Sequence, residues 1–587
     1  MKRERICMAD TKIIVEVAME ISLTPELLEN IAQKFSPAAA RESAMTTSVG
    51  GIGPLLRERI IEEAENGYEI IGVSLLYEHV WMQRWHPWGQ LYLEKRKTSN
   101  YIKPVLIKCP HVLNVHMYNG SIVAATVWKA SYGKAVVFFL ESQEITDVVY
   151  PGVEDAPPEI ADKLRWYEDL RMQQSWLLGR GMLELMKLLQ KKPSAVILSE
   201  TPTMFAWHNL INDGLKNDPL FDQTKYIFND HTPLEYAHPI WDKERLKSLR
   251  VDESYYTSLP NNQLKSDLTD ITQLLVAGVD KVYGVARIHG EVMRSMATLK
   301  PYAEKIQTIT NGVSLDFWQD PAFKNIDQLP DADLLAHKLQ AKKILINWIW
   351  RRYKLWSAWT DKAVQRPLIL WTRRITGYKR LDILIETVKN DQYRKRFIDT
   401  DVTILLGGRI HQQDGLSKMV VFKLLDFLAE HPDIENRIVF LDNYNVWEAP
   451  KLFVGIDATI MMSDKGKEAS ATGFMKAQLN GGMVIASPDG AIPESVIFSN
   501  GHNNDISPNG FEIKYIGGHP TPDTFLDAIE GCANVYADDT KRAAMMRSAI
   551  AMTNQISIAK TTGEMIKLFE SLFTPTPNES LISPKKG

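Results

Sequence analysis

The chain has 587 residues, of which 45% are hydrophobic and 24% are charged, and its formal net charge is -4 at pH 7. This composition is typical of a globular protein with two or three domains. It gives no reason to expect a nucleic-acid or anionic-membrane partner, and no run of about 18 uncharged apolar residues predicts a membrane span.

The cysteines and the N-terminus bear on the compartment. Cys7, Cys109 and Cys532 are too few and too scattered for a disulfide framework or a metal cluster. Glu16 interrupts the first apolar run, so the beginning of the chain predicts a strand and not a secretory signal. We therefore expect a cytoplasmic protein without a metal site.

The first 330 residues alternate short apolar strands with helical stretches, as α/β domains do. Helices are expected from about residue 55 to 66 and over 284–296, and 100–150 should form a mostly antiparallel insert. Strands are expected at 13–18, 70–76, 195–198, 226–228 and 305–309.

Glycine and polar residues at strand ends are the first site candidates, because α/β sheets place ligand contacts there. Gly50, Gly51 and Ile52 form a glycine-rich turn before a helix, a shape that cradles phosphate or sugar. His231 and Asn311 follow two later strands. A plain tight turn and ordinary helix caps would explain the same residues.

A helical connector is predicted at 331–365, and a second α/β run follows it. Its strand candidates alternate with helices, which indicates a doubly wound parallel sheet. We expect an N-terminal domain over 1–330, a C-terminal Rossmann-like domain over 366–575 and a disordered polar tail over 576–587. The second set of strands is expected at 368–371, 402–406, 438–441, 458–461 and 484–486.

The loop after the first of these strands is strongly basic. Arg373, Arg374, Lys379 and Arg380 fall within eight positions. At the C-terminal end of a parallel strand they would direct positive charge at a cleft. The alternative is a solvated basic surface loop.

Residues 468–482 predict a small-residue loop that enters one short helix. Thr472 is expected to cap the first turn, and Asn480-Gly481-Gly482 to end the helix. The small residues before the cap would let a ligand approach the backbone. Glu468 could hydrogen-bond a polyol, and a desolvated Lys476 could form a Schiff base. The alternative is an ordinary helix entry with a solvated lysine.

This stretch resembles the pyridoxal-phosphate attachment segment of the α-glucan phosphorylases, Glu-Ala-Ser-Gly-Thr-Gly-x-Met-Lys, with Ala471 in place of one glycine. The basic loop, the Gly-Gly-x-Gly turn and further segments between residues 13 and 494 match that family in order. The resemblance implies two Rossmann-like domains, the GT-B glycosyltransferase architecture, with the active site between them.

The resemblance also implies roles for individual residues. Lys476 would carry pyridoxal 5'-phosphate, and Arg374 and Lys379 would hold the substrate phosphate as catalytic residues. Arg373, Thr472, Gly473 and Tyr444 would contact the cofactor. The substrate would meet Gly50, Gly51, Ile52, His231, Asn311, Tyr378, Glu468, Ala469, Ser470 and Ala471.

The implied reaction is phosphorolysis of terminal α-1,4-glucosyl units of glycogen or maltodextrin by inorganic phosphate. It gives glucose 1-phosphate with retention, and we expect a homodimer. The chain departs from the family at Tyr283 (for asparagine), Asn445 (for arginine) and Ser199-Glu200-Thr201-Pro202 (for Asn-Glu-Gly-His), which leaves acceptor specificity open.

Two alternatives stand beside this reading. One is a sugar-nucleotide-dependent retaining glucosyltransferase, in which a second glutamate would stand at the position of Lys476. The other is a catalytically inactive glucan-binding homologue, suggested by the missing histidine and by Asn445.

Overall fold

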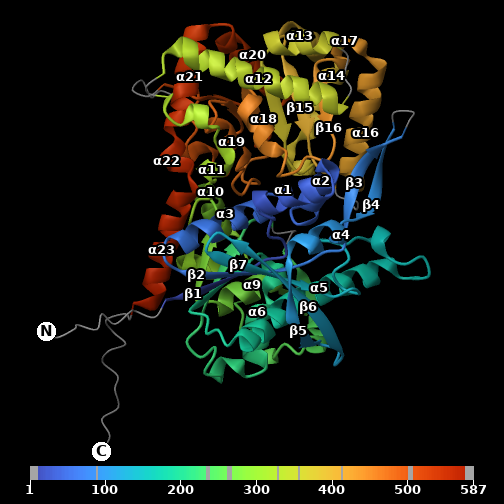
Figure 1. Cartoon of the computed structure of the whole chain (residues 1–587), viewed down its shortest axis with the longest axis vertical. Coiled ribbons are helices and arrows are strands. Elements are labelled where there is room, and N and C mark those ends of the chain that lie inside the picture. Colours follow the sequence, from blue (N-terminus) through green and yellow to red (C-terminus); the bar gives the residue numbers. More distant parts are fainter. Residues whose placement is uncertain are drawn as a thin grey trace, which may run out of the picture.

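The structure, a computed structural model, describes residues 11–86, 90–232, 234, 238–260, 267–326, 329–353, 357–410, 414–499 and 507–574. Figure 1 shows two α/β halves, with the earlier part of the chain in the lower half and the later part in the upper half. The predicted disordered tail at 576–587 lies outside the described residues.

The N-terminal half contains a nine-stranded sheet in the order β13-β12-β9-β8-β1-β2-β7-β6-β5. From β13 to β7 neighbouring strands are parallel, and β6 and β5 are antiparallel. The strands are β1 (Ile13–Val17), β2 (Glu69–Leu75), β5 (Ile107–His116), β6 (Ile122–Tyr132), β7 (Ala135–Glu141), β8 (Ala195–Ser199), β9 (Lys225–Asp230), β12 (Lys281–Gly284) and β13 (Ile306–Thr308).

Helices and two small antiparallel pairs complete this half. The pairs are β3 (His79–Trp85) with β4 (Leu91–Lys97), and β10 (Ile240–Asp242) with β11 (Leu268–Asp270). The helices are α1 (Pro25–Lys34), α2 (Pro37–Thr46), α3 (Ile52–Glu65), α4 (Ser99–Ile102), α5 (Lys163–Leu189), α6 (Phe205–Asn212), α7 (Lys243–Ser248), α8 (Glu253–Thr257), α9 (Ile271–Gly278), α10 (Arg287–Ser295) and α11 (Leu315–Trp318).

The C-terminal half is built on a six-stranded parallel sheet in the order β16-β15-β14-β17-β18-β19. Every residue of the first five strands is buried, as expected of a sheet covered by helices on both faces. The strands are β14 (Leu368–Thr372), β15 (Thr403–Gly407), β16 (Ile438–Leu441), β17 (Ala458–Met461), β18 (Met483–Ala486) and β19 (Gly510–Glu512).

The remaining helices follow the predicted alternation. Two of them, α12 (Asp331–Tyr353) and α13 (Ser357–Gln365), occupy the predicted connector. The others are α14 (Leu381–Lys389), α15 (Asp391–Asp399), α16 (Gly415–Glu430), α17 (Pro432–Glu435), α18 (Ala449–Gly455), α19 (Gly473–Gln478), α20 (Pro522–Tyr536), α21 (Asp539–Ala551), α22 (Thr553–Ile556) and α23 (Ile558–Phe573).

The mostly antiparallel pairing predicted at 100–150 is confirmed for β5, β6 and β7, and β7 also pairs in parallel with β2, which joins these strands to the main sheet. One expectation differs from this architecture. Helix α23, predicted in the C-terminal domain, returns along the lower half in Figure 1. There the Phe569 ring packs on Tyr68, with ring centroids 5.3 Å apart.

Candidate active site

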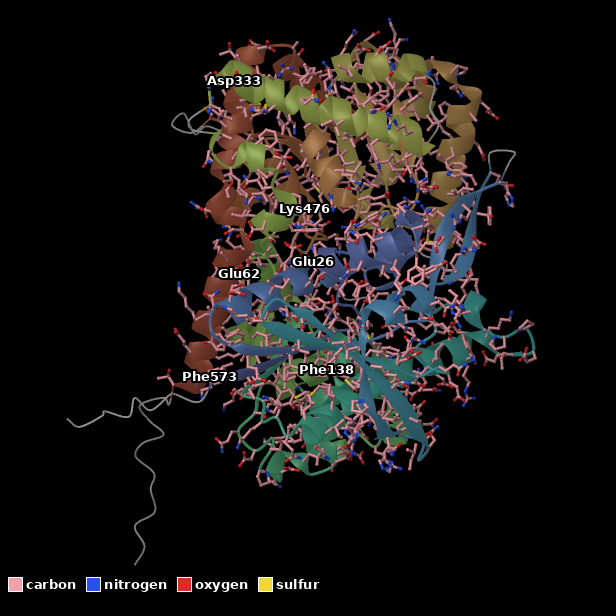
Figure 2. The ribbon with its side chains drawn as sticks, viewed as in Figure 1. Glu26, Glu62, Phe138, Asp333, Lys476 and Phe573 are labelled. Carbon is pink, nitrogen blue, oxygen red and sulfur yellow. The ribbon has the colours of Figure 1, made fainter. Side chains whose placement is uncertain are left out.

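A cavity of about 200 Å³ lies between the two halves, where strands of both sheets end. Lys476 lies at this boundary (Figure 2). The structure brings all the site residues predicted from the sequence to the wall of this one cavity: Gly50, Gly51, Ile52, His231, Asn311, Arg373, Arg374, Tyr378, Lys379, Tyr444, Glu468, Ala469, Ser470, Ala471, Thr472, Gly473 and Lys476.

Lys476 is buried in the short helix α19, between β17 and β18. Its Nζ lies 3.9 Å from the centroid of the Trp318 ring. Burial lowers the pKa of the Lys476 ammonium to about 8, although the nearby Glu58 carboxylate favours the charged form. A larger fraction of this amine is therefore neutral at pH 7 than for an exposed lysine.

Glu468 forms a buried ion-pair cluster with two of the basic residues. Its Oε2 accepts hydrogen bonds from the Arg373 guanidinium and, at 2.7 Å, from Lys379 Nζ. Burial alone would raise the pKa of Glu468, but Arg373 and Lys379 hold it below its usual range. Glu468, predicted to hydrogen-bond the sugar, therefore also holds in place Arg373 and Lys379, which are predicted to contact the cofactor and the substrate phosphate.

Arg374 has a different environment. Its side chain is exposed toward the cleft and forms no ion pair with any residue that the structure describes. A Cβ atom added at Gly50 would lie 3.6 Å from Arg374 Cδ. The glycine-rich turn and Arg374 therefore meet across the boundary between the halves.

The glycine-rich turn is held in place by Glu20. Val49 N donates to Glu20 Oε2 at 2.5 Å, and the chain then enters α3. A Cβ atom added at Gly51 would meet no atom within 4 Å. Close packing by protein atoms therefore does not require glycine at position 51.

The loop before α19 departs from expectation at its cap. Thr472 occupies the N-cap position, but its side chain makes no capping hydrogen bond, because its φ of -56° is already helical. The loop is held by Asp489 instead, whose Oδ2 accepts from Glu468 N at 2.9 Å. Ala471 has a φ of 67°, a conformation that favours glycine.

His231 and Asn311 reach the cavity from the N-terminal sheet. The His231 ring pairs with Asn229 Nδ2 through Nε2 at 2.7 Å. Desolvation in the cleft lowers the pKa of His231 to about 3, and the positive charge of Arg59 adds to this, so the imidazole is neutral at pH 7. Asn311 is buried, and its backbone N donates to Val285 O at 3.1 Å.

Sequence reasoning missed residues that complete this wall. Trp318 covers Lys476, and its Nε1 donates to Glu58 Oε1 at 2.8 Å. Arg409 lines the cavity and donates to Met45 O at 2.9 Å and Ser48 O at 3.1 Å. No local motif indicates these contacts, because the partners are more than 150 residues apart in the chain.

Comparisons with known proteins show which proteins this chain is similar to. Residues 327–497 match the family model described as carbohydrate phosphorylase. Maltodextrin phosphorylase from Thermococcus litoralis is 25% identical over 503 residues, which span 75% of this chain and 58% of that protein. Glycogen phosphorylase from Aquifex aeolicus is 24% identical over 524 residues, 78% of this chain and 73% of that protein.

Over residues 327–497 the chain matches the carbohydrate phosphorylase family model, and over most of its length it is similar to maltodextrin and glycogen phosphorylases. Its fold is the GT-B glycosyltransferase fold. The catalytic domain of starch synthase IV from Arabidopsis thaliana, solved with ADP and acarbose, superposes with a TM-score of 0.70 at 16% identity, covering 96% of this chain and 99% of that one. Among the described residues, no helix is long and apolar enough to cross a bilayer.

Two residues that depart from the phosphorylase pattern form hydrogen bonds in this structure. Asn445, at the position of an arginine, donates through Nδ2 to Glu448 Oε2 at 3.0 Å, and its Oδ1 accepts from Glu448 N at 3.0 Å, which orders the start of α18. Tyr283, at the position of an asparagine, accepts from Arg59 at 2.5 Å.

The segment that lacks the phosphorylase histidine borders a second cavity of about 500 Å³. Glu200 and Pro202 line it together with His238, which comes from another segment. Burial and the neighbouring Asp230 raise the pKa of Glu200 to about 8. The cavity thus retains an imidazole, although Pro202 supplies none.

Proposed function

We propose that this protein is a pyridoxal-phosphate-dependent α-glucan phosphorylase. The observation that carries the proposal is the meeting of Lys476 with Arg373, Arg374 and Lys379 around one cavity. A sugar-binding module needs neither a buried amine of lowered pKa nor several cations there. A phosphorylase needs both, one for its cofactor and the others for two phosphate groups.

The residues present fit pyridoxal phosphate. Lys476 provides an amine whose neutral fraction is raised by burial. Ser470 lines the cavity, and its Oγ is buried without a hydrogen-bond partner among the described residues, so a polar group in this loop remains unpaired. Lys476 would attach the cofactor, and Arg373, Thr472, Gly473 and Tyr444 would surround it.

When bound, pyridoxal phosphate would supply a phosphate group that hands a proton to the substrate phosphate. The other elements of the reaction belong to this chain. Arg374 and Lys379, with the Gly51 amide, hold inorganic phosphate beside the glucosyl unit. The held phosphate protonates the glycosidic oxygen and then bonds to C1 on the face that the glucan leaves, so glucose 1-phosphate forms with retention.

The sugar is oriented by uncharged and negative groups of the same cavity. Neutral His231, Asn311 and the Glu468 carboxylate converge on the cavity as hydrogen-bonding groups for hydroxyls. The positive charge that develops on the sugar is stabilised by the phosphate that Arg374 and Lys379 keep in place. The substrates would be maltodextrin or glycogen with inorganic phosphate.

Chemical trapping tests the cofactor assignment. The protein is incubated with pyridoxal phosphate, reduced with borohydride and digested, and the peptides are analysed by mass spectrometry. The pyridoxyl group should lie on Lys476, and Lys476→Arg protein should carry none. Lys338 is the internal comparison, because burial lowers its pKa to about 8 as well. Label on Lys338 or on another lysine, or no label, would overturn the assignment.

A further inference from the structure

One residue of the β3–β4 hairpin directs all its hydrogen-bonding groups to the other half of the protein. Gln83 is 2% exposed. Its backbone N donates to Asn443 Oδ1 at 2.7 Å, and its backbone O accepts from Asn443 Nδ2 at 2.6 Å. Its side chain donates to Gly408 O at 3.2 Å and accepts from Ile410 N at 2.9 Å. These four bonds join segments more than 320 residues apart.

Two further residues of the hairpin pack on the same half. Leu91, the first residue of β4, is 4% exposed and lies in the C-terminal core with Trp371 and Ile375. The Trp85 ring meets Phe440 of β16 edge-on, with centroids 6.2 Å apart. Figure 1 shows the hairpin rising from the lower half beside α16. The hairpin therefore contacts the N-terminal half through His79, Arg84 and Lys95 and the C-terminal half through Gln83, Trp85 and Leu91.

The two segments that Gln83 holds also form part of the cavity wall. Gly408 and Ile410 flank Arg409, which lines both cavities and donates back to Trp81 O at 3.4 Å and Met45 O at 2.9 Å. Asn443 directly precedes Tyr444 and Asn445, which line the cavity that holds Lys476. Gln83 itself lines neither cavity.

We propose that the β3–β4 hairpin is a clasp that holds the two halves closed, and that Gln83 is a positioning residue acting through Arg409 and Tyr444. The side-chain amide of glutamine can donate to a carbonyl and accept from an N–H at the same time, so it recognises this pair of groups specifically. Because the amide does not ionise, these hydrogen bonds do not depend on pH near neutrality. The ligand-binding part of the proposal rests on the proposed function, whereas closure of the halves does not.

Hydrogen exchange on ligand-free protein tests closure. Gln83→Ala removes only the side-chain bonds to Gly408 and Ile410, while the backbone bonds to Asn443 can still form. The clasp predicts faster amide exchange both around Gly408 and Ile410 and in the 443–449 segment, because loss of the side-chain bonds releases the whole hairpin. Exchange at the wild-type rate in that segment would overturn the clasp, whatever ligand the protein binds.

Ligand measurements test positioning. In the variant, closure must be driven by ligand binding, so the affinity for pyridoxal phosphate should fall about tenfold, as should that for inorganic phosphate. With glucose 1-phosphate and maltodextrin, KM should rise while kcat stays within about twofold, since saturating substrate restores closure. An unchanged KM and unchanged affinities would overturn the positioning role.

Asn509→Ala is the matched control. Asn509 is a fully buried amide that bonds to backbone within the C-terminal half, accepting from Ile497 N at 2.9 Å, and it lines neither cavity. It should lower the melting temperature without changing KM. If wild-type protein binds no pyridoxal phosphate while exchange still rises in Gln83→Ala, the proposed function fails and the clasp stands.

Gln83→Glu covers the case in which the alanine variant does not fold. A protonated carboxyl can donate to Gly408 O and accept from Ile410 N, whereas a carboxylate can only accept. KM in this variant should therefore rise with pH as the carboxyl ionises, relative to wild type. A constant ratio of the two KM values across that range would contradict the assigned hydrogen bonds.

Discussion

Ala471 has a backbone conformation that favours glycine over alanine. Its φ of 67° falls where a side chain is strained, and the phosphorylase pattern has glycine there. Ala471→Gly should raise the free energy of unfolding by about 0.5–1 kcal/mol, after allowing for the greater freedom of glycine in the unfolded chain. Thermal unfolding measures this gain. Ala469→Gly, two residues away and without a positive φ, should lose stability, and an equal loss in both variants would argue against strain.

Two buried lysines with similar pKa values should respond in opposite ways to replacement. Lys338 Nζ donates to Val454 O and Asn480 O, at 3.0 and 2.9 Å, so Lys338→Met leaves two carbonyls unpaired and should destabilise the protein. Lys476 lies over the Trp318 ring, and its charge is held out of water. Lys476→Met should therefore stabilise the ligand-free protein.

The pH dependence of the second effect follows from linkage. The pKa of Lys476 is about 8 in the folded protein and near its ordinary value of 10.5 in the unfolded chain. Below pH 8 both states are protonated, and burial of the charge costs up to about 3 kcal/mol. The gain from Lys476→Met should be largest below pH 8 and shrink between pH 8 and 10.5. A pH-independent difference in urea unfolding would contradict this.

Substitutions of Arg374 and of Lys379 should also have different effects on folding. Lys379 is buried against Glu468, so Lys379→Ala weakens both phosphate binding and folding. Arg374→Ala should leave folding within about 0.5 kcal/mol of wild type. It should weaken phosphate binding roughly ten- to a hundredfold, through loss of a charge-assisted hydrogen bond. Calorimetric titration with phosphate checks this, and normal affinity in Arg374→Ala would mean that Arg374 does not hold the phosphate.

At the scale of elements, the turn before α3 offers a test of ligand approach. Gly51 has a φ of -82° and open space around its Cα, so Gly51→Ala should fold normally. Its methyl group would occupy the ligand side of the turn and weaken phosphate binding by about tenfold. Gly53→Ala is the contrast, because its Cβ would lie 3.0 Å from Ser22 Oγ and should lower the melting temperature. Unchanged phosphate affinity in Gly51→Ala would remove the turn from the site.

Elements that carry a local signal were predictable from sequence. The helix that contains Lys476 and the strands that end at Arg373, His231 and Asn311 follow from apolar runs and turn residues. Within each sheet the carboxyl ends of parallel strands share one edge, and the residues meet because these edges of the two sheets border the same cavity. The β3–β4 hairpin carries no such signal, since Arg84, Glu94 and their neighbours make it polar and its partner surface is supplied by the other half. The role of Arg409 was hidden for the same reason.

At the scale of the whole molecule, the C-terminal helix packs against the N-terminal half. Helix α23 ends on the N-terminal half, where Met565, Leu568 and Phe569 are buried beside residues of α3. The residues after 366 therefore do not all pack within the C-terminal half. Sequence periodicity cannot show such a return, because it reports that a helix has an apolar face and not which half covers it. The homodimer and the cytoplasmic location stay predictions.

The measurement that tests the central claim most directly is the choice of glucosyl donor. Protein loaded with pyridoxal phosphate should release inorganic phosphate from glucose 1-phosphate and a short maltodextrin. It should transfer nothing from UDP-glucose or ADP-glucose, because the volume beside Lys476 is assigned to the cofactor and not to a nucleoside. Lys476→Ala should abolish the first activity without creating the second. Transfer from a sugar nucleotide by protein free of pyridoxal phosphate would contradict the account. So would tight glucan binding without turnover of either donor.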